Sequence, residues 1–283
     1  MKKLLLTLLF LAGTLTGLYA QKKERIVYAV KNKDILWFDR YMPEKDYNNI
    51  TLVFVHGGAF TGGHPDNQKP LAEGMTKLGY QVIVLKYRLY LQGRSFGCET
   101  ATSEKTKAIY TAMEDVRTAT EYFLRNASRY RIDTGKMFIA GSSAGAEAVL
   151  NLVYDPYSGR KESAPAHPYK GILSFAGALL DITPLERNKK IPLLLMHGTN
   201  DQLVPFATAP HRFCNASDAG WMMMFGSETI FNLYQQAGAP AVLYAYNGKG
   251  HEVSNFMFRE FEMMDAFMKA VLNNQLNSAR YNL

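Results

Sequence analysis

Apolar residues along the chain gather in short runs separated by polar stretches. The run TLVFVH at 51–56 is continuous and rich in β-branched and aromatic residues. Strands that are buried on both faces of a sheet have this pattern, whereas strands with one solvated face alternate apolar and polar residues. We expect further strands of this kind at 80–87, 136–140, 170–176, 191–196 and 241–246.

Helix-like stretches separate these strands, and we expect helices at about 69–78, 104–128, from 144, 226–237 and 254–273. This alternation is typical of the α/β class, in which helices cover both faces of a parallel sheet. Before it, ERIVYAV and DILWFDRY flank the turn-forming KNKD within 24–40. The pattern therefore predicts a mostly parallel central sheet with an antiparallel N-terminal edge.

Three long irregular segments interrupt this series, at 91–103, 155–169 and 202–225. Ligands of parallel sheets bind at the carboxyl ends of the strands, and long connections there are often functional. Any of the three could cover a site, and the sequence does not decide which. Because no repeat or Pro/Gly-rich linker divides the chain, we interpret 21–283 as a single catalytic domain.

The first twenty residues, MKKLLLTLLFLAGTLTGLYA, place two lysines before an apolar run and end on the small residue Ala20. This layout predicts a secretory signal peptide at 1–20, and hence a secreted or periplasmic protein with no stable membrane span after cleavage. The alternative is an uncleaved membrane anchor. Interrupting threonines and glycines, and a length that is short for a span, favour cleavage.

Composition and charge exclude several classes. The chain is 47% hydrophobic and 20% charged, which is typical of a globular protein and not of a disordered or collagen-like one. The formal net charge is +7, but the basic residues are scattered, so we expect no nucleic-acid partner. Cys98 and Cys214 either form a disulfide between two loops or remain separate buried thiols. Their spacing predicts no metal site, and we expect no cofactor.

The strongest chemical signal is the sequence Gly141-Ser142-Ser143-Ala144-Gly145, between the strand-like KMFIA and the helix-like AEAVLNLVY. A G-x-S-x-G motif at a strand-to-helix turn is typical of a nucleophile elbow, in which glycines relieve crowding around the serine. Ser143 is the candidate nucleophile. The N–H of Ala144, at the amino end of the helix, is a candidate oxyanion-hole donor.

A serine nucleophile needs a base that a carboxylate holds in the right tautomer. His251 follows the strand AVLYAY and Asp201 follows the strand IPLLLM, so both are expected on the same sheet edge as Ser143. Asp181 and Glu252 compete with Asp201 as the acid. Among the remaining histidines, we expect surface roles for His64, His167 and His211, and a packing or hydrogen-bonding role for His197.

The segment His56-Gly57-Gly58-Ala59-Phe60 ends the strand at 51–56, where glycines let backbone N–H groups approach an acyl oxygen. Together HGGAF, GSSAG, HGTND and GKGHE resemble the α/β-hydrolase superfamily from about 35 to 272. They are most similar to the carboxylesterase and lipase group with an HGGG-type motif, including acetyl-esterase-like and feruloyl-esterase-like members.

This resemblance implies that Ser143 is the nucleophile, Asp201 the acid and His251 the base. It also implies that Gly58, Ala59 and Ala144 supply the oxyanion donors. The chain departs from the family at Ala59, which replaces the third glycine, in the sequence after Tyr87-Arg88, and in the insertions at 91–103 and 202–225.

The sequence thus predicts a secreted serine esterase that works through an acyl-enzyme. Export favours acetyl or feruloyl esters of polysaccharides as substrates, with a small-molecule or polysaccharide-linked ester as the partner; the oligomeric state stays open. The alternatives are a peptidase or amidase of the same fold, and a catalytically inactive binding module. The apolar stretch 221–225, WMMMF, forms either an acyl pocket or core packing or a dimer contact, and Phe60, Tyr90 and Phe96 leave the same choice.

Overall fold

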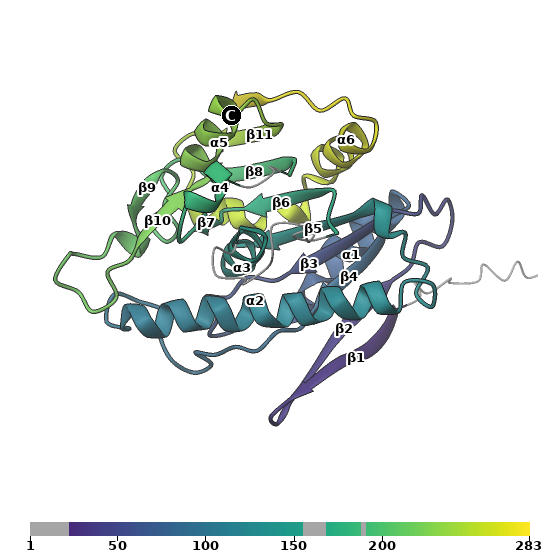
Figure 1. The fold of residues 1–283 in the computed structure, drawn as a ribbon, viewed down its shortest axis with the longest axis horizontal. Coiled ribbons are helices and arrows are strands. Elements are labelled where there is room, and N and C mark those ends of the chain that lie inside the picture. The colour runs from purple at the N-terminus through teal and green to yellow at the C-terminus, as the bar shows by residue number, and fades with distance from the viewer. Residues whose placement is uncertain (1–22, 155–167, 188–190) are drawn as a thin grey trace, which may run out of the picture.

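The computed structural model describes residues 23–154, 168–187 and 191–283 (Figure 1). A nine-stranded sheet forms its centre. In spatial order its strands are β1 (Lys23–Lys31), β2 (Asp34–Tyr41), β4 (Gln81–Leu85), β3 (Thr51–Val55), β5 (Met137–Ser142), β6 (Gly171–Phe175), β8 (Leu193–Gly198), β11 (Ala241–Tyr246) and β12 (Ala279–Asn282).

The two pairings at the N-terminal edge are antiparallel, and the pairings from β4 to β12 are parallel. The predicted hairpin at 24–40 and the mostly parallel sheet are therefore confirmed. In Figure 1 this hairpin lies at one end of the sheet and β11 lies near the other. The predicted signal peptide at 1–20 and most of segment 155–169 fall outside the described residues.

Helices cover both faces of the sheet, as the alternating pattern predicts. They are α1 (Lys69–Lys77), α2 (Thr102–Arg125), α3 (Ala144–Val153), α4 (Thr183–Arg187), α5 (Ser227–Gln236) and α6 (Phe261–Leu272), with 3₁₀ helices η1 (Pro65–Gln68), η2 (Thr134–Lys136), η3 (His211–Phe213) and η4 (His251–Phe258). The predicted helix at 254–273 is wrong in its first part, because η4 precedes α6. Across the described ranges, no helix combines the length and apolar character that a membrane crossing needs.

Alternate residues of the central strands enter two different cores. Val53 and Val55 pack with α2, α3 and α5 on one face, while Leu52 and Phe54 pack with α1 and α6 on the other. All four side chains are fully buried. Successive side chains of a strand point to opposite faces, so a strand covered on both sides is apolar at every position. The unbroken run TLVFVH has this physical origin.

Segment 202–225 is more ordered than its irregular sequence predicts. It contributes β9 (Thr208–Pro210) and most of β10 (Met223–Gly226), which pair antiparallel with each other. β10 also pairs with the short strand β7 (Ala178–Leu179). Segment 202–225 thus takes part in a small three-stranded sheet, in the order β7-β10-β9.

Candidate active site

Ser143 lies at the sharp turn between β5 and α3, with the left-handed backbone angle φ = +51°. Non-glycine residues rarely adopt this conformation, and it is characteristic of strained turns at functional sites. A Cβ atom at position 141 would collide with the Gly145 carbonyl, and one at 145 would collide with the Val55 carbonyl. Both motif glycines are thus required by close backbone contacts that hold the serine at the tip of the turn.

The three predicted triad residues lie in one hydrogen-bonded chain. The Ser143 Oγ atom is 2.7 Å from His251 Nε2, and His251 Nδ1 is 2.7 Å from Asp201 Oδ2. Each residue follows the carboxyl end of a different parallel strand, β5, β11 or β8. Since parallel strands end on the same sheet edge, residues far apart in sequence meet here. A serine, a histidine and a carboxylate in this order can relay a proton away from the hydroxyl.

Asp201 is almost fully buried and accepts hydrogen bonds on both carboxylate oxygens. Its Oδ1 accepts from the backbone N–H groups of Leu203, at 2.8 Å, and Val204, at 3.0 Å. Burial alone would raise the pKa of Asp201, but hydrogen bonds from His197 and His251 outweigh it and hold this pKa well below its ordinary value. The carboxylate therefore stays charged opposite His251.

The two competing acids have other partners. Asp181 Oδ1 accepts a hydrogen bond from the Thr183 N–H, 2.8 Å away, at the start of α4. Glu252 Oε2 accepts from the Gly250 N–H at 3.0 Å. Within the described ranges, Asp201 is the carboxylate that contacts the ring of His251.

His197 supports Asp201 from the opposite side, and its predicted packing and hydrogen-bonding role is confirmed. The ring is fully buried, and its Nε2 lies 3.1 Å from the Val204 carbonyl and 3.3 Å from Asp201 Oδ2. Both are acceptors, so Nε2 carries the hydrogen. Its Nδ1, 2.9 Å from Ser227 Oγ, is then free to accept from that hydroxyl.

The predicted oxyanion residues surround Ser143. Gly58 and Ala59 have φ angles of +123° and +53°, and the Gly58 carbonyl accepts from the N–H groups of Thr61 and Gly62, each at 3.0 Å. Gly58, Ala59 and Ala144 all line the pocket at Ser143. Ala59 adopts the left-handed conformation although it replaces a glycine, so its methyl group is accommodated in the turn.

His56 stabilises this turn through a contact with the Gly57 carbonyl. Its Nδ1 is 2.7 Å from the Gly57 carbonyl, and its ring stacks on Tyr87 at a centroid distance of 4.6 Å. Burial lowers the pKa of His56 to about 4, so the imidazole is neutral near pH 7. Because the carbonyl can only accept, Nδ1 carries the hydrogen of this neutral ring.

A pocket of about 420 Å³ opens in front of Ser143. Its lining includes Asn67, Asn255, Phe96, Glu147 and residues of segment 202–225. Segments 91–103 and 202–225 both therefore contribute to the pocket wall. Residues 155–167, a further candidate cover, lie outside the described part of the chain.

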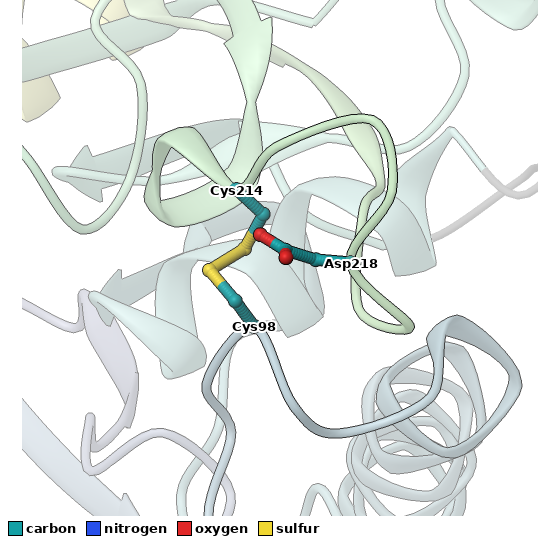
Figure 2. Close-up of side chains that lie close together, drawn as sticks. All are labelled: Cys98, Cys214 and Asp218. Carbon is teal, nitrogen blue, oxygen red and sulfur yellow. A yellow bond between two sulfur atoms is a disulfide. The ribbon is translucent and has the colours of Figure 1, made fainter.

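Cys98 and Cys214 form a disulfide between these two segments (Figure 2). The Cys98 carbonyl also accepts from the Gly220 N–H at 2.8 Å. Asp218 lies beside the sulfur atoms in Figure 2, but its Oδ2 already accepts from the Asn215 N–H. Sulfur atoms that are bonded to each other are not the thiolates that metals prefer, so this grouping fits a structural tether and not a metal site.

The surface role predicted for His211 is wrong. Its side chain is only 2% exposed, it packs edge-to-face on Phe96 at 5.0 Å, and it lines the pocket. Sequence reasoning also missed Glu147 and Arg212, which lie in the same wall. One signal was present: Glu147 is the single charged residue within the apolar helix α3, four positions after Ser143. His64 is about half exposed, as predicted, and His167 falls outside the described residues.

Solved structures of an esterase have the same fold. Esterase 2 of Thermogutta terrifontis, in its propionate-bound form, superposes with a TM-score of 0.65 at 18% identity, covering 90% of this chain and 95% of that one. The form phosphorylated by paraoxon gives the same values. The chain has the α/β-hydrolase fold.

Sequence comparisons connect the chain with esterases and lipases. Residues 38–154 match the BD-FAE family model, an α/β-hydrolase-type esterase family. The mouse lysophosphatidylserine lipase ABHD12 is 25% identical over 205 residues, which are 62% of this chain and 47% of that protein. The neuroligin-like protein glit-1 of Caenorhabditis elegans is 26% identical over 151 residues, 52% of this chain and 19% of that protein. The chain thus spans about half the length of the mouse relative and about a fifth of the nematode one.

The apolar stretch 221–225 does not line the pocket at Ser143. Met222 and Met224 are buried in the core, whereas Trp221 and Met223 are partly exposed. The core-packing interpretation therefore fits the two buried methionines, and an acyl pocket built by this stretch is wrong for the pocket at Ser143. Phe60 is also a core residue, while Phe96 contributes to the pocket wall.

Proposed function

We propose that the chain is a serine esterase in which Ser143 is the nucleophile, His251 the general base and Asp201 the residue that orients and stabilises the protonated base. The observation that carries the proposal is the continuous hydrogen-bonded chain from Ser143 Oγ through His251 to Asp201, with both contacts at 2.7 Å. Ser143 and His251 line a pocket whose lining also includes Gly58, Ala59 and Ala144. The esterase-type relatives support the same reading.

The proposed reaction has two halves. His251 Nε2 takes the proton of Ser143 Oγ while that oxygen bonds to the ester carbonyl carbon, and the N–H groups of Gly58, Ala59 and Ala144 bind the resulting oxyanion. The carbon–oxygen bond to the alcohol then breaks, and protonated His251 gives its proton to the leaving oxygen. Water repeats the sequence on the acyl-enzyme, which releases the acid and restores Ser143.

The finer part of the proposal is an exported enzyme that acts on acetyl or feruloyl esters linked to polysaccharides. The signal-like residues 1–20 support export, and a disulfide is most common in proteins of oxidising compartments. A comparison of acetylated xylan, methyl ferulate and plain aryl acetates tests the substrate class. Activity confined to medium-chain lipids would contradict it.

The central experiment measures hydrolysis of p-nitrophenyl esters from acetate to longer acyl chains by wild type, Ser143→Ala and Ser142→Ala. We expect Ser143→Ala to lower kcat by roughly 10⁴-fold or more, because the nucleophile is lost and only binding and oxyanion contacts remain. Ser142 is the matched control, since its Oγ donates to the Ser254 carbonyl at 2.8 Å and does not contact His251. Equal losses in the two variants would refute the assignment.

The two alternatives give different results in the same assays. A peptidase or amidase would cleave p-nitroanilides at rates comparable with the matching esters. An inactive binding module would turn over no ester and would leave Ser143 unlabelled by a fluorophosphonate probe. The esterase proposal expects labelling in wild type and in Ser142→Ala but not in Ser143→Ala.

A further inference from the structure

One wall of the pocket carries three polar side chains that the proposed reaction does not use. Glu147 comes from α3, one helical turn after Ser143, and His211 and Arg212 come from η3. All three line the pocket, and the first two are only 1% and 2% exposed. Burying such groups costs free energy unless they are hydrogen-bonded, so their partners need an explanation.

Each of the three has a buried polar atom with no hydrogen-bond partner in the described part of the chain. These atoms are Glu147 Oε1, His211 Nδ1 and Arg212 Nε. Glu147 Oε1 and His211 Nε2 are 3.5 Å apart, which is long for a hydrogen bond. Three orphaned atoms on one pocket wall are the pattern expected where a polar ligand group supplies the missing partners.

Arg212 is the cation among the described residues that line the pocket. The guanidinium of Arg212 makes no ion pair with the described residues, although its charge acts on Glu147. Lys105 is fully buried and donates to the Gly220 carbonyl at 2.8 Å, and its charge also acts on Glu147. Burial raises the pKa of Glu147 to about 8, which leaves its carboxyl largely uncharged at neutral pH. An anionic group in the pocket would find Arg212 in the lining and Lys105 behind it. The charges of both cations also act on Glu99, but this carboxylate is exposed and does not line the pocket.

The backbone also holds Arg212 in place. Its φ is +56°, a conformation that residues other than glycine seldom adopt, and its N–H donates to the Leu203 carbonyl at 3.0 Å. Two positions later, the Cys214 disulfide ties the same segment to Cys98. A strained arginine that is held by a hydrogen bond and a covalent tether is preorganised for a ligand.

We propose that Arg212, with Glu147 and His211 beside it, forms a carboxylate-binding subsite, so that the preferred substrates are esters that carry a second, ionised carboxylate close to the scissile bond. The planar guanidinium matches a carboxylate in shape and charge, and the neutral Glu147 carboxyl can donate a further hydrogen bond to it. This inference rests on the proposed esterase function and narrows its substrate class.

The carboxylate has two sources, the acyl part or the alcohol part of the ester, and matched substrate pairs distinguish them. For the acyl part, the pair is monomethyl glutarate and its neutral monoamide analogue. For the alcohol part, the pair is para-acetoxybenzoate and para-acetoxybenzamide. Each pair differs by one charge at nearly constant size, so the ratio of kcat/KM within a pair measures charge recognition and not fit.

The ratios are measured with wild type, Arg212→Gln and Lys107→Gln. Lys107 is the matched control, because it is an exposed residue of α2 outside the pocket and its loss changes the net charge equally. In one of the two pairs we expect wild type to prefer the charged ester by about tenfold to a hundredfold, the range for hydrogen bonds to charged groups. Arg212→Gln should abolish that preference, and Lys107→Gln should keep it.

Two outcomes would overturn the subsite. One is the absence of a charge preference in both pairs. The other is an equal loss of the charge preference in the two variants, which would indicate long-range electrostatic steering. Wild type that cleaves neither these esters nor aryl acetates would instead refute the proposed function itself. A second test uses wild type alone and measures competitive inhibition of p-nitrophenyl acetate hydrolysis. Glutarate should inhibit about tenfold more strongly than glutaramide, and equal inhibition would contradict the proposal.

Discussion

The hydrogen bonds around Asp201 explain why this carboxylate, among several near the sheet edge, holds His251. Its two oxygens accept from the N–H groups of Leu203 and Val204 and from the rings of His197 and His251. Four donors around one buried carboxylate keep it ionised and leave it little freedom to rotate. The same oxygen that faces His251 Nδ1 thereby fixes the tautomer in which Nε2 can accept a proton.

Replacing Asp201 with asparagine should therefore impair catalysis far more than folding. We expect Asp201→Asn to lower kcat for p-nitrophenyl acetate by about 10⁴-fold near neutral pH, because the amide can leave His251 in the wrong tautomer. Steady-state kinetics measure the effect. Asp181→Asn is the matched control, since Asp181 contacts Thr183 instead, and it should retain most of the activity. A larger loss in Asp181→Asn would assign the acid role to that residue.

The residues of the triad could be predicted from sequence because local backbone chemistry marks them. Gly141 and Gly145 are required by close contacts around Ser143, with the turn itself and with the end of the neighbouring strand β3. His211 and Arg212 could not be predicted in the same way. They lie in a segment that β9, β10 and the Cys98–Cys214 disulfide hold in place, and two cysteines in a sequence leave that pairing open.

At the scale of elements, the central strands could be predicted because burial on both faces makes them apolar throughout. The sequence ARYN of β12 lacks such a run, because this strand lies at the edge of the described sheet, beside β11, and is largely exposed. β9 and β10 were missed for a related reason: they are three and four residues long and form a small sheet with β7. Pairing partners, and not their own sequence pattern, define these strands.

The disulfide should stabilise the pocket wall as well as the fold. Removing it with Cys98→Ser and Cys214→Ser together should lower the free energy of unfolding by roughly 2 to 5 kcal/mol, since the bond closes a long loop. KM should rise more than kcat falls, because Arg212 and His211 lose their tether while the triad is untouched. Urea unfolding and steady-state kinetics measure the two effects.

Reductant supplies the control for this prediction. Wild type treated with dithiothreitol should behave like the double serine variant, and the variant itself should not respond to the reagent. An unchanged KM in both cases would mean that segment 202–225 keeps its place through β9 and β10 alone.

Across the whole molecule, the sheet order brings the site together. β3, β5, β6, β8 and β11 are consecutive neighbours, and four of them end in the glycine turn, Ser143, Asp201 and His251. The same edge buries several titratable groups with opposite effects on stability. Burial lowers the pKa values of His56 and His211, so the folded state binds fewer protons than the unfolded chain as pH falls below about 6.5, and stability decreases in acid.

Glu147 has the opposite effect on stability, because it stabilises the folded state in acid. Burial raises its pKa from 4.5 to about 8, while the charges of Arg212 and Lys105 partly offset this rise and that of Asp201 adds to it. His211, from η3, and Tyr87, after β4, also face this group. Between pH 4.5 and about pH 8, the folded state keeps a proton on Glu147 that the unfolded chain releases. The stabilisation is therefore full below pH 4.5 and is lost as pH rises towards 8.

Glu147→Gln should remove this loss, because an amide of nearly the same shape does not titrate. We expect the free energy of unfolding of the variant, relative to wild type, to be higher at pH 9 than at pH 5 by roughly 2 to 4 kcal/mol. Urea unfolding at the two pH values measures it, and the difference between the proteins cancels the titration of groups that they share. Glu252→Gln, which changes an exposed carboxylate, should show no such dependence. A difference for Glu147→Gln that is equal at both pH values would mean that this carboxyl is already ionised in the folded protein at pH 5, and that an ion pair with Arg212 compensates its burial.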